Sequence, residues 1–374
     1  MKTQRLAFII LLLSVSKMYA QFDEAPFRMF GYFQISFMQQ LIKDESDKKS
    51  FDMQQFNLFL QRDLTENWST FINFEYLNNF SSGKSWGDFS LNEVWVKYYL
   101  SKRFNLKLGL QIPPFNNLNE ISNKTPLLPY IIRPLAYETS FNEFLNLEDF
   151  TPQRAFAQIY GFIPIEDTKL DYAFYVGNSP NISTKETSTG QSGVDTTNLF
   201  LVGGRIGLRY EDIKIGFSAS YDEITKFNQL KTYFGLPEYD FNNIPRFRIG
   251  HDILLDFKKV SFQAEYIKVL YNTNNLLDLD KQFFYVTMGY RITDDLLAYF
   301  SLYSLQEHFN VNIPNFAHLN TEVSVTTPNV GLAYDINDRI KIKGQFARVD
   351  IDVTNYPEHE SLIFYYAAAI SVFF

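Results

Sequence analysis

Basic side chains recur at alternate positions in several stretches of this sequence. Arg246 and Arg248, for example, stand two residues apart. Alternate residues of a β-strand point to the same face, so each such set would present its charges on one side of a strand. Where such a face lines a channel, rings of Arg or Lys favour the passage of anions. The basic residues that the alternation assigns to an interior face are Arg154, Arg205, Arg209, Arg246, Arg248, Arg339, Lys341 and Lys343.

Acidic side chains fall on the same interior faces. They are Glu75, Asp171, Asp252, Asp256 and Glu265. Two interpretations of these charges stay open at this stage. Either the basic residues select the ions that pass, or the opposite charges pair across neighbouring strands and only keep the interior hydrated.

One long segment, residues 113–152, carries a second group of candidate residues. At roughly 40 residues it greatly exceeds the usual loop length, and loops of this size are functional or disordered. Its apolar content, as in Tyr130, Ile131 and Ile132, predicts packing, whereas the contrasting stretch 178–198 is rich in Ser, Gly and Thr. We expect it to fold into the interior as a constriction rather than to form an external cap. The charged residues of this expected constriction are Lys124, Arg133, Glu138, Glu143, Glu148 and Asp149.

Catalytic and metal chemistry find little support in the residue pattern. The four histidines are His251, His308, His318 and His359, and their spacing matches neither a metal site nor a Ser-His-Asp triad. No Gly-x-Ser-x-Gly motif occurs, and the chain has no cysteine. The sequence therefore predicts no enzyme, no cofactor and no metal site.

The elements that must position these residues are strands of about ten residues with alternating apolar and polar side chains. About sixteen of them continue to the end of the chain, an even number as single-chain bacterial barrels require. They are expected near 26–41, 51–62, 68–78, 88–100, 104–112, 153–164, 168–177, 199–210, 213–223, 245–257, 259–271, 281–292, 295–306, 321–335, 339–353 and 361–374.

The connections between these strands alternate strictly between short and long. Seven are short and polar, at 62–67, 101–103, 166–167, 211–212, 258, 294 and 336–338. Eight are longer, at 43–50, 79–87, 113–152, 178–198, 224–244, 272–280, 307–320 and 354–360. Short periplasmic turns and long extracellular loops are typical of outer-membrane barrels, and this order puts both termini on the periplasmic side.

The alternation also assigns an outward, lipid-facing side to each strand. In the final stretch Phe364, Tyr366, Ala368, Ile370, Val372 and Phe374 form that side. A last strand of this kind, ending in Phe, resembles the signal by which the barrel assembly machinery recognises its clients. Three charged or titratable residues also fall on the outward side of their strands. Lys268 and Arg348 could bind head-group phosphates of outer-membrane lipid, including lipopolysaccharide, and His251 could lie at a contact between protomers.

Composition and the first residues agree with an exported membrane protein. Lys2 and Arg5 precede a short apolar stretch, 6–15, so residues 1–20 are expected to form a secretory signal peptide. The chain is 17% aromatic, with 38 Phe and 24 Tyr, and these residues suit a lipid-facing pleated surface and its water boundary. The formal net charge of −8 argues against a nucleic-acid partner.

Several short segments resemble one known family. They are Arg133-Pro-Leu-Ala-Tyr-Glu-Thr139, Phe150-Thr-Pro-Gln-Arg154, Ile159-Tyr-Gly161, Leu170-Asp-Tyr172 and Gly177-Asn178. Together they look like the phosphate-selective porin O and P family, in which Pro-x-Arg opens a strand and the next strand leads into an Asn- and Gly-rich loop. Ala157 stands where the family commonly has Gly, and the family's Lys-rich ladder is not identifiable in the sequence. The resemblance therefore implies a porin more than it implies phosphate.

These observations predict an all-β protein of the bacterial outer membrane. Residues 21–374 would form a transmembrane antiparallel β-barrel with residues 113–152 as an inward constriction loop. Sixteen strands enclose an aqueous lumen, so we expect a water-filled channel for passive diffusion of small hydrophilic solutes, leaning toward anions of the phosphate type. A homotrimer is expected by analogy with porins of this size. The alternatives are a plugged or substrate-specific transporter, for instance for hydrophobic compounds, and a barrel hydrolase.

Overall fold

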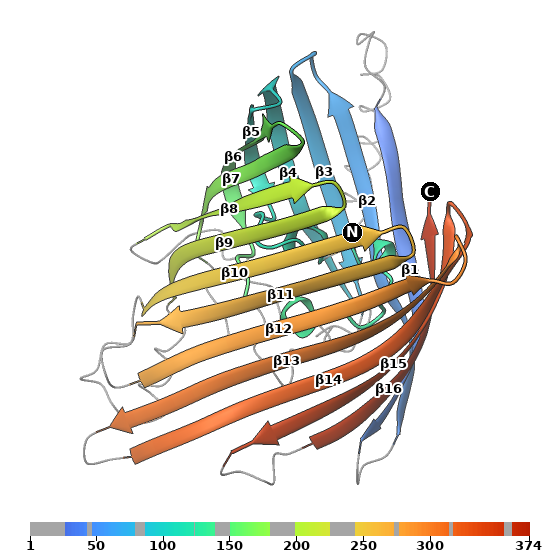
Figure 1. The fold of residues 1–374 in the computed structure, drawn as a ribbon, viewed down its shortest axis with the longest axis vertical. Helices are drawn as coiled ribbons and strands as arrows, with labels where there is room; N and C mark the ends of the chain where they lie inside the picture. Colours follow the sequence, from blue (N-terminus) through green and yellow to red (C-terminus); the bar gives the residue numbers. More distant parts are fainter. Residues whose placement is uncertain are drawn as a thin grey trace, which may run out of the picture.

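The chain forms a closed antiparallel β-barrel of sixteen strands. Figure 1 shows the fold of this computed structural model. The structure describes residues 27–42, 47–78, 87–122, 124–138, 150–179, 199–224, 244–272, 277–313, 317–354 and 361–374. The expected signal peptide, 1–20, lies outside these residues. The strand count and the all-β fold class predicted from the sequence are confirmed.

The strands follow one another around the barrel in chain order. They are β1 (Arg28–Ile42), β2 (Lys48–Asp63), β3 (Trp68–Leu77), β4 (Asp88–Ser101), β5 (Phe104–Gln111), β6 (Ala155–Ile165), β7 (Thr168–Gly177), β8 (Leu201–Tyr210), β9 (Ile213–Ile224), β10 (Ile244–Phe257), β11 (Val260–Tyr271), β12 (Leu277–Arg291), β13 (Leu296–Ile313), β14 (Ala317–Asn337), β15 (Ile340–Val353) and β16 (Ser361–Phe373). The described helical turns all lie between β5 and β6: α2 (Asn119–Ser122), η1 (Thr125–Leu127) and η2 (Leu135–Tyr137).

The barrel closes where the first strand pairs with the last. β1 and β16 run antiparallel, with Tyr32 opposite Phe373. Gly31 and Phe374 exchange both backbone hydrogen bonds at 3.0 Å, so the C-terminal residue completes the ladder. A closed sheet leaves no unpaired strand edge, which is the condition for a β-structure to cross a bilayer. No helix among the described residues has the length and apolar character needed to cross a membrane.

The predicted short turns connect their strands as two-residue hairpins or slightly longer loops. Glu166, Glu211 and Lys258 begin three of them and have positive φ angles of 51°, 46° and 41°. This left-handed backbone matches the twist of the flanking strands and permits the tight reversal. The largest difference from the sequence lies at 307–320, where we expected a long loop.

There the strands continue instead. β13 and β14 pair without interruption to Ile313 opposite Ala317. The outward side chains beyond residue 304 are polar, such as Gln306 and His308, so the apolar alternation ends before the strand pairing does. Backbone hydrogen bonding carries this hairpin beyond the apolar belt, and β12 likewise begins at residue 277 rather than 281.

The strand faces assigned from the sequence in β8, β9 and β16 have the predicted orientation. Outward apolar side chains such as Ile206, Leu208 and Ile215 are between 46% and 49% exposed, as lipid-facing residues are when no lipid is present. In β16 the inward residues are buried and the outward Tyr366 is exposed. His251 and Arg348 lie on the outward face, exposed as predicted.

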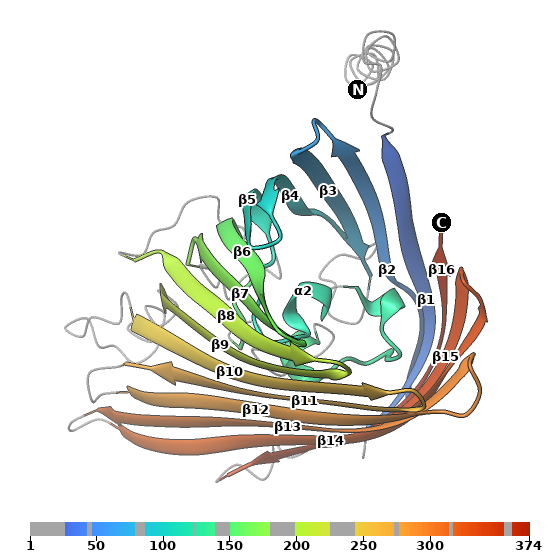
Figure 2. The ribbon, with the colours of Figure 1, turned by 45° about the horizontal axis from the view of Figure 1, so that its top comes forward.

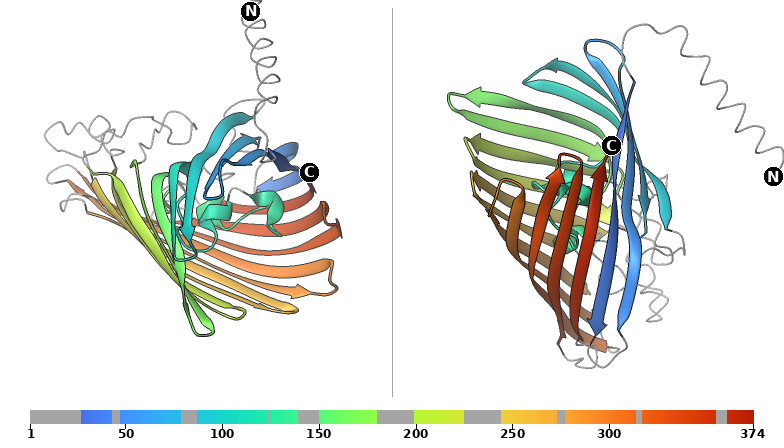
Figure 3. Two further views of the ribbon diagram at one scale, coloured as in Figure 1. Left: turned by 90° about the horizontal axis from the view of Figure 1, so that it is seen from above. Right: turned by 90° about the vertical axis from the view of Figure 1, so that its right-hand side faces the viewer.

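The described part of the 113–152 segment lies inside the barrel. Figures 2 and 3 show α2 and the two short 3-10 turns within the ring of strands. Their side chains form the main hydrophobic core with the inner wall: Phe115, Ile131 and Leu135 are fully buried and pack in one cluster with Tyr303 and Val325 of β13 and β14. The inner wall of β11–β16 is therefore largely apolar, which differs from the uniformly polar interior that the alternation suggested.

Candidate pore lining

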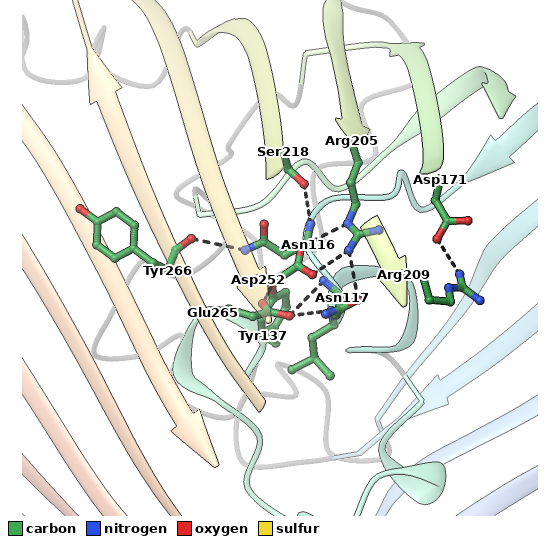
Figure 4. Close-up of polar contacts among 11 residues, drawn as sticks. Asn116, Asn117, Tyr137, Asp171, Arg205, Arg209, Ser218, Asp252, Glu265 and Tyr266 are labelled. Carbon is green, nitrogen blue, oxygen red and sulfur yellow. Dashed lines mark hydrogen bonds and ion pairs between the residues drawn. The ribbon is translucent and has the colours of Figure 1, made fainter. Parts of the chain in front are cut away.

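Several strands of the inner wall hold the long segment through hydrogen bonds, and two anchors, on β11 and β15, stand out. Figure 4 shows the first anchor, Glu265 of β11. Its carboxylate accepts hydrogen bonds from the backbone N–H groups of Asn117 and Leu118, at 3.1 and 2.9 Å, and from the Tyr137 hydroxyl at 2.6 Å. Burial raises the pKa of Tyr137 well above its ordinary value, and the neighbouring Glu265 charge raises it further. The hydroxyl therefore stays protonated and remains a donor.

The second anchor consists of two neighbouring inward residues of β15. The Lys343 ammonium donates to the carbonyls of Thr125 and Tyr130, at 2.8 and 3.4 Å, and to the Gln34 side chain at 2.8 Å. The Gln345 side chain accepts from the N–H groups of Ile131 and Ile132, at 2.7 and 2.8 Å, and donates to the Ile132 carbonyl at 3.1 Å. Buried backbone groups need such partners, so these side chains fix the path of residues 125–132.

The charged residues predicted for the constriction are divided. Arg133 and Glu138 are buried and pair with each other at 3.4 Å within the segment, so both help to shape it rather than face open space. Lys124 is partly exposed beside η1. Glu143, Glu148 and Asp149 lie outside the described residues.

The basic residues predicted for the lumen do not form one cluster. Arg246 and Arg248 of β10 have no exposed surface and pair with Asp222 of β9, at 2.6 and 3.2 Å. Arg154 donates to Asn92, and Lys341 pairs with Asp335 at 3.3 Å. Lys343 is covered by the long segment, and Arg339 is exposed in the turn before β15.

Arg205 and Arg209 of β8 lie apart from this set and face open space. Arg205 forms a bidentate pair with Asp252, at 2.7 and 3.2 Å, and donates to Asn117 of the long segment at 3.1 Å, as Figure 4 shows. Arg209 pairs with Asp171 at 2.7 Å, and its side chain is 45% exposed. Glycine at positions 207 and 216 leaves the inner wall flat beneath the Arg205 guanidinium.

These two arginines border a cavity of about 500 Å³ between the long segment and strands β4–β9. Pro114 and Glu120 line it from the segment. Its basic side chains are Lys97, Lys102, Lys107, Arg205, Arg209 and Lys214, against the carboxylates Glu120 and Asp171. Lys102 lies in the short turn between β4 and β5, so the cavity extends to the end of the barrel where the short turns are. Aromatic side chains, including Tyr99, Tyr160 and Phe162, complete the lining.

Reasoning from the sequence missed the lysines of β4 and β5 in this cavity. Lys97 and Lys107 stand ten residues apart in the chain but are directly opposite in the sheet. The sequence did contain a hint of them, because Asn105 and Lys107 are polar residues at alternate positions of a predicted strand and therefore lie on one face. Only the strand register, however, brings the two lysines together on the wall of the cavity that Arg205 also lines.

Comparison with solved structures identifies the architecture. The channel DcaP of Acinetobacter baumannii superimposes with a TM-score of 0.61 at 10% identity, covering 94% of this chain and 97% of that one. The fold is that of an outer-membrane porin. An anion-selective porin from Comamonas acidovorans gives 0.58 at 10% identity over 94% and 100% of the two chains. A trimer form of OmpT from Vibrio cholerae gives 0.56 at 10% identity over 94% and 100%. The predicted outer-membrane barrel is thus confirmed at the level of the fold.

Sequence comparisons do not refine this assignment. No protein-family model matches the chain, and no curated protein matches it. The likeness to the phosphate-selective porin O and P family therefore rests on the short segments described above.

Proposed function

We propose that this protein is an outer-membrane porin through which small hydrophilic solutes diffuse passively, with a preference for anions. One arrangement supports the proposal above all. The long segment packs against the largely apolar inner wall of β11–β16, while the opposite wall, β4–β9, borders an open cavity with six basic and two acidic side chains. Solutes would pass on this second side, and residues 113–138 would form the constriction.

The preference for anions follows from the charges left without a counterion in the cavity. Arg205 and Arg209 each pair with one carboxylate. Lys97, Lys102, Lys107 and Lys214 have no ion-pair partner among the described residues. A narrow passage with this excess of positive charge lowers the free energy of an anion and raises that of a cation. Phosphate would be one such anion, as the resemblance in the sequence implies.

Liposome swelling tests the passive pore. Liposomes that contain the purified protein should swell in isotonic sugars up to a size limit, and the rate should fall steadily as the sugar becomes larger. An anionic sugar acid should enter faster than an amino sugar of similar size. Absence of swelling with the smallest sugars would contradict a passive pore and support a plugged transporter.

The other functions considered from the sequence receive less support. A transporter of hydrophobic compounds would need an accessible apolar pocket, yet the apolar inner wall is covered by residues such as Phe115, Ile131 and Leu135. A hydrolase would need a catalytic histidine facing a substrate. His251 and His308 lie on outward faces, His318 pairs opposite Asn312 near the end of the β13–β14 hairpin, and His359 lies outside the described residues. Within the described part of the chain, no cluster of metal-ligating side chains occurs.

We further propose that three copies associate through the outer faces of β5–β8. These strands have only 8 to 11 residues, and their outward residues, such as Phe156, Phe174 and Val202, are apolar to the extracellular end. In contrast, β11–β15 carry charged outward residues. Lys268 pairs with Asp280 there, at 3.5 Å. This charged surface would face lipopolysaccharide. During assembly, β16 would be the strand that the barrel assembly machinery binds. Crosslinking in intact outer membranes tests the oligomer, and a monomer only would contradict it.

A further inference from the structure

Two pairs of basic residues with like charge border the cavity at two levels. Lys97 of β4 lies directly opposite Lys107 of β5, and Arg209 of β8 lies directly opposite Lys214 of β9. Like charges that are directly opposite in a sheet destabilise it. Their presence on one cavity wall therefore points to a counterion that is not part of the chain.

The partners within the protein leave much of this charge free. Arg209 is neutralised by Asp171 at 2.7 Å, but Lys214 has no ion-pair partner among the described residues. Lys107 lies 5.1 Å from the centre of the Trp95 ring, a contact that holds the ammonium without neutralising it. Lys97 also lacks a carboxylate partner in the described part of the chain.

Strand register separates the two pairs. The row of Lys107 continues through Gln158 and Tyr175 to Gly203 of β8. Gly203 and Arg209 are six residues apart on that strand, which corresponds to about 20 Å of backbone. Long, flexible lysine side chains shorten the gap, but a single small ion cannot contact both pairs at once.

The wall between the two pairs carries aromatic side chains beside charges that are already paired within the protein. Tyr160 and Phe162 line the cavity there. Arg205 and Asp171 lie in the same rows, paired with Asp252 and Arg209 respectively. A cavity of about 500 Å³ lies in the range that holds a small organic molecule. Its lining thus has a cationic end, a middle with aromatic rings and internally paired charges, and a second cationic end.

We infer that this cavity is a binding site for organic dianions whose two acidic groups are separated by an apolar body. One acidic group contacts Lys97 and Lys107, the body lies along Tyr160 and Phe162, and the other group contacts Lys214. Glu120 lines the same cavity and opposes binding through its charge. The inference rests on the proposed porin function, because it names the class of solute that the basic side of the pore retains.

Calorimetric titration of the detergent-solubilised protein with unbranched dicarboxylates tests the site without requiring transport. In a series from succinate to dodecanedioate, the affinity should rise with chain length to an optimum and then level off or fall. Lys97→Gln and Lys214→Gln should each weaken the optimal dicarboxylate roughly tenfold, which corresponds to the loss of one charged contact. Lys268→Gln, which removes a lysine from the outer surface, serves as the control and should change nothing.

A double-mutant cycle identifies a ligand that bridges both ends. With the optimal dicarboxylate, the Lys97→Gln effect should become much smaller once Lys214 is replaced, whereas a monocarboxylate of equal length should show no such coupling. Affinity independent of chain length, or equal effects of both variants on mono- and dicarboxylates, would overturn the inference. A protein that binds dicarboxylates in this way but carries no current in a bilayer would instead overturn the porin function.

Discussion

Replacing Gln345 by Leu tests how the long segment is held inside the barrel. Leucine keeps about the same volume but can neither accept from the N–H groups of Ile131 and Ile132 nor donate to the Ile132 carbonyl. Each buried N–H that loses its acceptor costs about 1–3 kcal/mol. At the lower end, the two donors together cost about 2 kcal/mol, so the undocked population of the segment should rise roughly 30-fold.

Limited proteolysis measures that population. Trypsin cuts after Lys124 only when the segment leaves the wall, because Thr125, on the other side of that peptide bond, is buried in the docked form. The bond after Arg133 is not a tryptic site, because Pro134 follows it. Where opening is fast relative to cleavage, the cleavage rate follows the open population, so Gln345→Leu should be cut roughly 30 times faster. Its single-channel conductance should also increase. Gln306→Leu, an exposed outward position on β13, serves as the control. Cleavage and conductance equal to those of the unmodified protein would refute this account of docking.

Two further substitutions test the buried charges. A side chain at Gly216 would overlap the Arg205 guanidinium and the carboxylate paired with it, so Gly216→Ala should destabilise the barrel by about 1–3 kcal/mol and alter the conductance. Unchanged thermal unfolding and conductance would contradict that arrangement. Asp222→Asn removes the negative charge that Arg246 and Arg248 share, and the loss of this buried pairing should cost about 3–5 kcal/mol in urea unfolding. A loss below 1 kcal/mol would indicate that other groups satisfy both arginines.

The architecture could be predicted from the sequence because alternation is a local property of each strand. Outward residues such as Ile206 and Leu208 and inward residues such as Arg205 were assigned correctly from their spacing alone. The extension of β13 could not be predicted in this way. Its pairing with β14 continues where the outward side chains become polar, so the apolar alternation ends before the strand does.

The site itself depends on relations that a single strand does not contain. Arg246 was placed on the inner face, but its burial depends on Asp222 in the neighbouring strand. The opposition of Lys97 and Lys107 depends on the register of β4 and β5. The apolar inner wall near Val325 breaks the expected polar interior because it packs against the long segment. No pattern within one strand encodes such contacts.

The zero-current potential of the channel tests the central claim most directly, namely that solutes pass along the basic wall of β4–β9. In a planar bilayer under a potassium chloride gradient, the unmodified protein should give a potential of the sign expected for chloride passage. Replacing Lys97, Lys107 and Lys214 together by Gln should move it toward zero or reverse it, while Lys268→Gln should leave it unchanged. A cation-selective potential in the unmodified protein, or one that the triple substitution leaves unaltered, would contradict the claim.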